Sequence, residues 1–157
     1  MQPFEHVVTE HGPAVLKVCR ALLGAPDADD AWSETFLAAL RAYPDLPDGA
    51  NVEAWLVTIA RRKAIDLYRA RRRRAVPMAR TPDQVSPHGN PAPPEDGLWD
   101  ALRTLTTRQR EAIALHHLAG LPYTEVAAVV GGTPTAARRA AADGMKILRS
   151  SLQEDPR

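Results

Sequence analysis

The densest group of charged side chains lies at residues 61–74, RRKAIDLYRARRRR, where eight of fourteen residues are Arg or Lys. The whole chain of 157 residues carries a formal net charge of only +1. Guanidinium and ammonium groups at this density neutralise phosphates and release counterions, which is the chemistry of nucleic-acid binding. A solvated basic face with no partner would have the same composition. The segment is therefore a candidate nucleic-acid interface that needs support from elsewhere in the chain.

Acidic and basic residues are segregated along the chain. Residues 1–58 hold nine acids against three bases, and residues 61–80 hold nine bases against Asp66 alone. The net charge is thus near zero because acidic and basic segments cancel, and the local electrostatic fields should be large. An acidic and a basic surface suggest two different partners. The acids of one cluster also lie in a predicted first helical turn, where they would stabilise the helix dipole without any partner; this cluster is Asp29, Asp30 and Glu34.

A second candidate is a helix-turn-helix at residues 123–152. Gly131 and Gly132 permit a tight turn, and Thr133 is placed to cap a helix that begins at Pro134. The predicted buried ladder of this helix is Ala137, Ala141, Gly144, Leu148 and Leu152. The side chains left outward, toward the major groove, are Thr135, Ala136, Arg138, Arg139, Ala142 and Asp143, with Lys146 and Arg149 in reach of phosphate. An ordinary helical hairpin with a solvated arginine pair is the alternative.

Catalytic and metal-binding chemistry has little support in the sequence. The chain has no Gly-rich phosphate-binding loop followed by Lys and no His-Glu-x-x-His pair. His116 and His117 are neighbours in a predicted helix and point apart by roughly 100°. Cys19 is the single cysteine, lies among apolar residues and has no basic activator. We predict no enzyme, no metal and no cofactor.

The elements that must position these residues are predicted to be helices. Hydrophobic residues make up 45% of the chain and aromatic residues 5%, and Ala and Leu are abundant. Helices are expected at residues 4–23, from about residue 27 to the turn YPDLPDG, and at residues 52–73. Pro13 is expected to bend or break the first. The second carries an inward stripe of Ala31, Trp32, Thr35, Phe36, Ala39 and Leu40.

Residues 75–97 contain six prolines and no apolar periodicity, which predicts an extended, mobile linker. Helical patterns resume at residue 98, where Thr106 and Gln109 have capping-box spacing and Gly120 can end a helix. The predicted fold is all-α, with small helical domains at residues 1–74 and 98–157 joined by this linker. No apolar stretch approaches the roughly 18 residues that span a bilayer, so we expect no membrane insertion and a cytoplasmic location.

Two stretches together resemble a known family. The run DADDAWSETFLAALRAYPDL followed by VEAWLVTIARRKAIDLYRARRRR resembles region two of bacterial RNA polymerase sigma factors of the extracytoplasmic-function (ECF) group. Residues 98–152 resemble their region four. The resemblance implies a factor that binds core RNA polymerase and directs promoter-specific initiation. Region two would dock on the polymerase clamp and melt DNA, and region four would bind the flap and read the upstream promoter element.

This resemblance assigns roles to the charged residues. It implies that Asp29, Asp30 and Glu34 face the polymerase, and that a loop residue, Asn51 or Asp48, bonds a flipped base with stacking by Tyr43. The residues implied for promoter DNA near the melted element are Arg61, Arg62, Lys63, Arg69, Arg71, Arg72, Arg73 and Arg74. Those implied for the upstream element are Thr135, Arg138, Arg139, Lys146 and Arg149.

The sequence also departs from the family pattern. Ser33 stands where the family usually has Gln, and residues 135–140 read TAARRA instead of approximately GTVKSR. Asp143 and Met145 replace residues that are commonly basic. An exposed Asp repels phosphate unless it accepts a hydrogen bond from a cytosine amino group. An unusual or weakened upstream-element preference is therefore expected.

Two other functions remain open at this point. A stand-alone helix-turn-helix regulator would dimerise to match paired half-sites, whereas a sigma factor should be monomeric when free and bind DNA poorly until polymerase separates its regions. A sigma-like protein without promoter activity is the other alternative. The predicted linker would also let an anti-sigma factor bind between the two domains.

Overall fold

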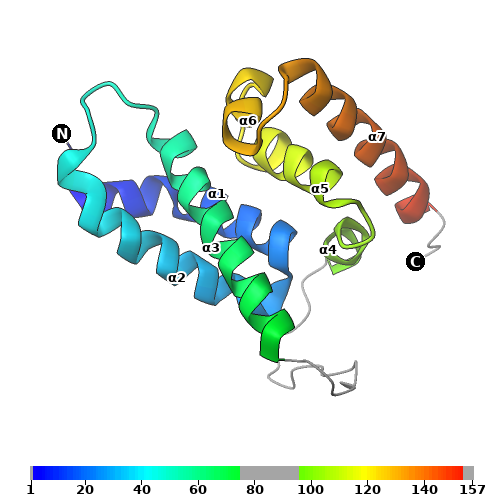
Figure 1. Ribbon diagram of the computed structural model, residues 1–157, viewed down its shortest axis with the longest axis horizontal. Helices are drawn as coiled ribbons and strands as arrows, with labels where there is room; N and C mark the ends of the chain where they lie inside the picture. The colour runs from blue at the N-terminus through cyan, green and yellow to red at the C-terminus, as the bar shows by residue number, and fades with distance from the viewer. Residues whose placement is uncertain (1, 75–95, 154–157) are drawn as a thin grey trace.

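The computed structural model describes residues 2–74 and 96–153, and within these ranges every regular element is helical (Figure 1). The predicted all-α fold is confirmed. The expected linker falls almost wholly outside the described residues, since only Asp96 and Gly97 of residues 75–97 are described, and they begin a helix.

The first group of helices consists of α1 (Phe4–Leu23), α2 (Ala25–Ala42) and α3 (Val52–Arg74), with a short 3-10 turn, η1 (Tyr43–Asp45), after α2. All three helices pack on one another around a core that includes Val7, Val15, Phe36 and Leu56. Gly24, with φ of +88°, makes the sharp junction between α1 and α2 that only glycine adopts readily.

Pro13, which was expected to bend or break the first helix, does not break it, because α1 is a single helix from Phe4 to Leu23. The preceding turn is held from outside the helix. Trp32 of α2 donates its indole N–H to the Gly12 carbonyl at 2.9 Å, and a Cβ at Gly12 would lie 3.4 Å from the same ring. A tertiary contact thus supports the turn where proline removes a backbone donor.

The second group consists of α4 (Asp96–Leu102), α5 (Thr107–Ile113) continued by a π-helical turn, η2 (Ala114–Leu118), then α6 (Tyr123–Val130) and α7 (Pro134–Gln153). The predicted local chemistry is present. Thr106 and Gln109 form a complete capping box at the start of α5. Thr133 caps α7 by accepting from the amide of Ala136 at 3.0 Å.

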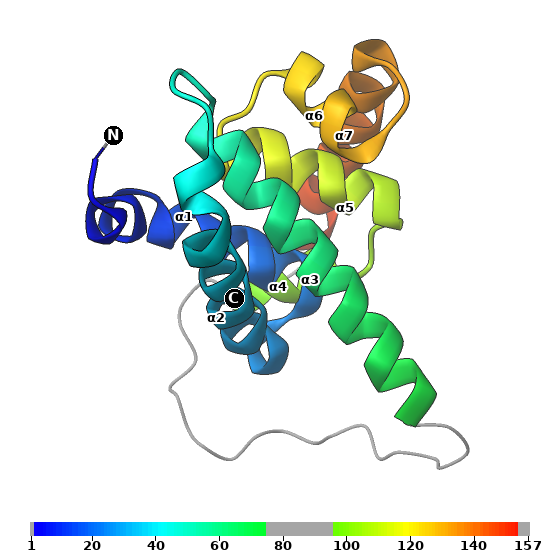
Figure 2. The same cartoon turned by 60° about the vertical axis from the view of Figure 1, so that its left-hand side comes forward.

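The two groups of helices share a core. Val18 and Ala21 of α1 and Val57 of α3 belong to the same buried apolar cluster as Leu102 and Leu115. Figures 1 and 2 show α5 and α6 lying alongside α1 and α3. In this arrangement the second group of helices covers the α3 face that carries Val57. This packing also affects the surroundings of the residues that follow Val57 in α3.

The predictions that Leu40 and Leu152 are buried are wrong. Leu152 is 43% exposed and Leu40 is 52% exposed. The last turn of α7 extends past Leu148, and Leu152 lies beside Gly97, where a Cβ would be 3.8 Å from Leu152 Cδ2 but glycine has no side chain to cover it. The remainder of the α7 ladder, Ala137, Ala141, Gly144 and Leu148, is buried as predicted.

α7 approaches α5 closely at Gly144. A Cβ at this position would lie 2.7 Å from Ile113 Cδ1 and 3.2 Å from Gln109 Cβ. We predict that Gly144→Leu lowers the free energy of unfolding by about 1–3 kcal/mol through overpacking. Ala142→Leu places the same side chain on the exposed side of α7 and should leave stability nearly unchanged. Thermal unfolding of the two variants checks this, and equal melting temperatures would contradict the packing described.

Candidate nucleic-acid and polymerase interfaces

The basic part of α3 begins at Arg61, where one side of the helix is still packed on the core. Asn51 caps its start by accepting from the amide of Ala54 at 3.0 Å, and Leu56, Ala60 and Ala64 bury one side. Four consecutive arginines, residues 71–74, form the last turn, where positive charge stabilises the helix dipole. Part of the charge density at residues 61–74 is therefore explained by helix stability alone.

Among the described residues, two of the eight basic side chains form ion pairs. Arg61 Nε lies 2.8 Å from Glu111 Oε2 of α5, and its Nη1 lies 3.4 Å from the Val129 carbonyl. Glu111 is only 6% exposed. Arg71 forms an ion pair with Asp27 of α2. In this arrangement Arg61 thus faces the second group of helices and is separated from the exposed basic surface.

Tyr68 lies within the basic surface and was missed by sequence reasoning. Its side chain is 55% exposed, Arg72 Cζ lies 5.7 Å from its ring centroid, and Arg72 Nη1 lies 3.3 Å from its hydroxyl. An exposed aromatic ring among arginines is typical of surfaces that stack unpaired bases. The i, i+4 spacing of Tyr and Arg in an otherwise basic run was the signal available in the sequence.

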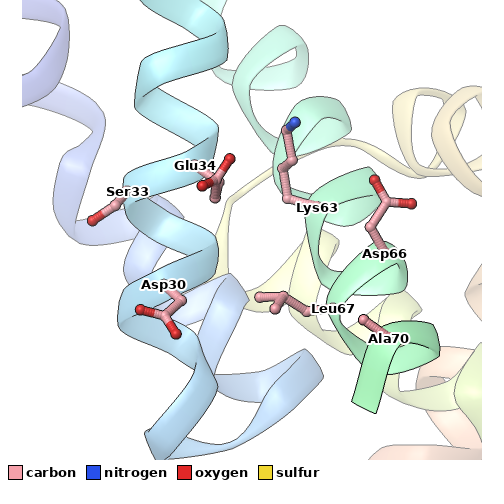
Figure 3. Close-up of a pocket in the computed structure, with 7 residues that line it drawn as sticks. All are labelled: Asp30, Ser33, Glu34, Lys63, Asp66, Leu67 and Ala70. Carbon is pink, nitrogen blue, oxygen red and sulfur yellow. The ribbon is translucent and has the colours of Figure 1, made fainter. Parts of the chain in front are cut away.

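The acidic side of the molecule forms a groove between α2 and α3. This groove has a volume of about 370 Å³, and Figure 3 shows Asp30 and Glu34 on α2 with Leu67 of α3 pointing toward that helix. The full lining is Asp30, Ser33, Glu34, Lys63, Asp66, Leu67 and Ala70. Lys63 therefore lies beside acidic groups, apart from the exposed arginines of α3.

Asp29, the third predicted acid, is exposed but is not part of this groove. It lies on the side of α2 that faces Cys19. Burial, together with the Asp29 carboxylate, raises the pKa of the Cys19 thiol to about 12. The cysteine is fully buried and stays a thiol at neutral pH, which agrees with its predicted packing role.

Exposed leucines extend the acidic edge of α2. Leu37 is 48% exposed and Leu40 is 52% exposed, one and two turns beyond Glu34. Sequence reasoning placed Leu40 in the core because its spacing matches the buried stripe. Solvent-exposed apolar side chains beside carboxylates are the composition of a protein-binding surface.

The outer side of α7 carries the residues predicted to face a major groove. Thr135, Arg138, Arg139 and Asp143 are all exposed. Arg139 and Asp143 line a groove of about 440 Å³ together with Thr106 and Arg108 at the start of α5, whereas Arg138 lies over the ring of Tyr123. Lys146 and Arg149 are exposed further along the helix.

The loop after α2 has fewer side chains free to contact an unpaired base than the sequence suggested. The hydroxyl of Tyr43 donates to the Gln2 carbonyl, and its ring packs edge-on against Phe4 with centroids 5.2 Å apart. Tyr43 is therefore part of the packing and is not free to stack on a base. Asn51 is exposed, although its carboxamide oxygen caps α3, and Asp48 is exposed.

These surfaces coincide with two family matches. Residues 7–74 match the family model described as Sigma-70 region 2, and residues 96–148 match Sigma-70, region 4. The chain is 31% identical over 161 residues to RNA polymerase sigma factor CarQ of Myxococcus xanthus, covering 96% of this chain and 90% of CarQ. It is 33% identical over 153 residues to ECF RNA polymerase sigma factor SigD of Mycobacterium tuberculosis, covering 89% of this chain and 72% of SigD. The chain is an ECF sigma factor.

The fold agrees with this identification. The sigma factor CnrH of Cupriavidus metallidurans is 33% identical over 144 residues, covering 82% of this chain and 75% of CnrH. A solved structure of CnrH in complex with the cytosolic domain of CnrY matches with a TM-score of 0.71 at 28% identity, covering 97% of this chain and 88% of CnrH. The predicted resemblance is confirmed, and the protein binds core RNA polymerase and directs promoter-specific transcription initiation.

Among the described residues, no helix is long and apolar enough to cross a bilayer, and no three His, Cys, Asp or Glu side chains gather in a way that would hold a metal ion. His116 and His117 meet edge-on with centroids 4.8 Å apart. Burial and the neighbouring His116 charge lower the pKa of His117.

The Arg61–Glu111 pair should couple the two regions of the sigma factor. Arg61→Met leaves a carboxylate buried without its partner, so we predict a loss of about 1–3 kcal/mol in the free energy of unfolding. Arg61→Met combined with Glu111→Leu should recover much of that loss, because no charge then remains buried. Thermal unfolding measures both, and Arg62→Met, at an exposed neighbour, is the control. Additive losses in the double variant would show that the pair is not coupled.

Proposed function

We propose that the acidic edge of α2 docks this sigma factor on polymerase, while the outer surfaces of α3 and α7 hold promoter DNA. The observation that carries the proposal is the separation of charge in the folded chain. Asp30 and Glu34 line the groove on α2, and the exposed arginines lie on the end of α3 and the outer side of α7. Opposite charges on separate surfaces suit two partners of opposite charge.

The polymerase surface combines charge with apolar contact. Asp30 and Glu34 complement a basic helix, and the exposed Leu37 and Leu40 supply apolar area beside them. Charged pairs steer encounter, whereas buried apolar anchors provide most of the binding free energy. The partner surface on polymerase is therefore expected to present both basic and apolar side chains along one helix. Asp29 belongs to the rim of this surface.

The DNA surface of α3 works in two steps. The exposed arginines bind phosphates of the duplex, and Tyr68 stacks on a base once strands separate. The residues proposed for phosphate contact are Arg62, Arg69, Arg72, Arg73 and Arg74. Arg61 and Arg71 join them only when their ion pairs open, and Lys63 joins them from its place in the groove between α2 and α3. Asn51 remains a proposed contact for an unpaired base.

The partners and units proposed for this chain follow from the same surfaces. CnrH forms a complex with the cytosolic domain of CnrY, and we propose that an anti-sigma factor likewise binds this chain.

Residues 1–74 and 98–157 are the proposed functional domains. The protein is proposed to act in the cytoplasm, to be a monomer when free and to catalyse no reaction. A stand-alone regulator would require dimerisation on paired half-sites, which size-exclusion chromatography with and without DNA would detect.

The role of α7 can be separated from polymerase docking. Replacing Arg138 and Arg139 by Glu reverses the charge that faces promoter DNA, so we predict loss of promoter-specific run-off transcription. Polymerase binding, measured by pull-down of the core enzyme, should be unchanged. Equal loss of transcription and of polymerase binding would mean that this helix is misassigned.

The role of α2 is tested by the converse variant. Asp30→Lys combined with Glu34→Lys should weaken binding to core polymerase by at least about tenfold, because like charges then meet at the interface. The matched control is Asp100→Lys, which makes the same kind of change at an exposed site on α4. Titration of core polymerase with labelled sigma factor measures both. An equal effect of the control would attribute the change to net charge.

A further inference from the structure

We propose that Tyr123 is a positioning residue that holds Arg138 in the orientation needed for promoter contact. The inference rests on the proposed function of α7 and adds a residue that lies outside that helix. Tyr123 is the first residue of α6, and Arg138 Cζ lies over its ring, 5.0 Å from the centroid. A guanidinium over an aromatic face is attracted by the ring quadrupole and is restricted to a plane near it.

The Tyr123 ring is itself held in place. His116 stacks on it with centroids 3.9 Å apart and planes inclined by 13°. His116 Nδ1 lies 2.8 Å from the Leu121 carbonyl oxygen, and because a carbonyl only accepts, Nδ1 carries the proton. The imidazole therefore cannot rotate freely, and it fixes the plane on which Tyr123 rests.

The position of His116 depends on the π-helical turn η2. In this turn the amide of Ala119 bonds the Ala114 carbonyl, five residues back, and the amide of Leu121 bonds the Leu115 carbonyl. A π turn changes the rotation of the side chains that follow it and is often found at functional sites. Here it brings His116 from the end of α5 to the start of α6, beneath the ring that contacts the recognition helix.

Arg138 and Arg139 differ in their aromatic contact. Neither forms an ion pair with a carboxylate among the described residues, and Arg139 lines the groove that Asp143 also lines, whereas Arg138 lies over the Tyr123 ring. A free arginine side chain samples many rotamers, and ordering it on binding costs conformational entropy. The ring of Tyr123 reduces that cost before DNA arrives. Tyr123 thus restricts the Arg138 side chain as a carboxylate partner would, without neutralising its charge.

A preorganised guanidinium matters more for base recognition than for phosphate contact. Bidentate bonding to guanine requires a defined orientation, whereas neutralising a phosphate tolerates many. Removing the ring should therefore reduce affinity for a promoter more than affinity for non-promoter DNA. The competing explanation is that Tyr123 only packs the helix-turn-helix, in which case both affinities fall together.

The experiment is a double-mutant cycle in the holoenzyme. Holoenzyme assembled from core polymerase and the full chain is titrated with two DNA duplexes of equal length. One duplex carries a promoter that run-off transcription has identified, and the other carries no promoter. The variants are Tyr123→Leu, Tyr123→Phe, Arg138→Ala and the combination of Tyr123→Leu with Arg138→Ala. Thermal unfolding of each free variant checks folding, and Tyr123→Met replaces Tyr123→Leu if the latter is unfolded at the assay temperature.

We expect Tyr123→Leu to weaken promoter binding by about 2–5-fold, the range of an exposed cation–π contact, while Tyr123→Phe retains the ring and stays near wild type. In the Arg138→Ala background, Tyr123→Leu should cause no further loss. If the two losses multiply, Tyr123 does not act through Arg138, and the positioning role is overturned while the proposed function of α7 stands. If Arg138→Ala alone changes nothing, both the role of Arg138 and that of Tyr123 fail.

Discussion

The ion pair between Arg61 and Glu111 constrains the rest of the structure. A carboxylate that is 6% exposed is stabilised by a cationic partner, because an unpaired buried charge costs several kcal/mol. The only side-chain partner of Glu111 within the described residues is an arginine of the other group of helices, at 2.8 Å. The apolar contacts of Val18, Val57 and Leu115 supply stability, and the ion pair joins α3 to α5 beside them. The pair also withdraws one arginine from the proposed DNA surface, so the packed arrangement and full use of that surface exclude each other.

The local structure of the chain was largely predictable because local rules decide it. Thr133 caps α7, Gly131 takes φ of +92°, and the buried ladder from Ala137 to Leu148 follows the helical period. The errors lie where distant packing decides the outcome. Pro13 lies within the continuous helix α1, whose Gly12 carbonyl accepts a hydrogen bond from Trp32 of α2, and Leu40 is exposed although its spacing matches the core stripe. Helical periodicity predicts which residues share a face of a helix, but it does not predict where the neighbouring helix that covers this face ends.

The candidate sites follow the same division. Residue type and helical spacing placed Asp30, Glu34, Arg138 and Arg139 on exposed or groove-lining surfaces, which the structure contains. The engagement of the Arg61, Arg71 and Tyr43 side chains depends on partners far away in sequence. These partners are Glu111, Asp27 and Gln2, which lie 50, 44 and 41 residues away. Pairing between distant polar groups leaves no periodic pattern in a single sequence. It is therefore the part of a site that only the folded chain shows.

The unusual acid in the recognition helix is explained by its neighbours. Asp143 lies four residues after Arg139, and both line the groove that Arg108 also reaches from α5. An Asp between two arginines leaves the local charge positive, so phosphate is still attracted to this surface. Its oxygens remain acceptors, and the complementary donor in a major groove is the amino group of cytosine. In the proposed complex with promoter DNA, this departure from the family pattern therefore bears on base preference, whereas the attraction of the helix to DNA depends on the arginines around it.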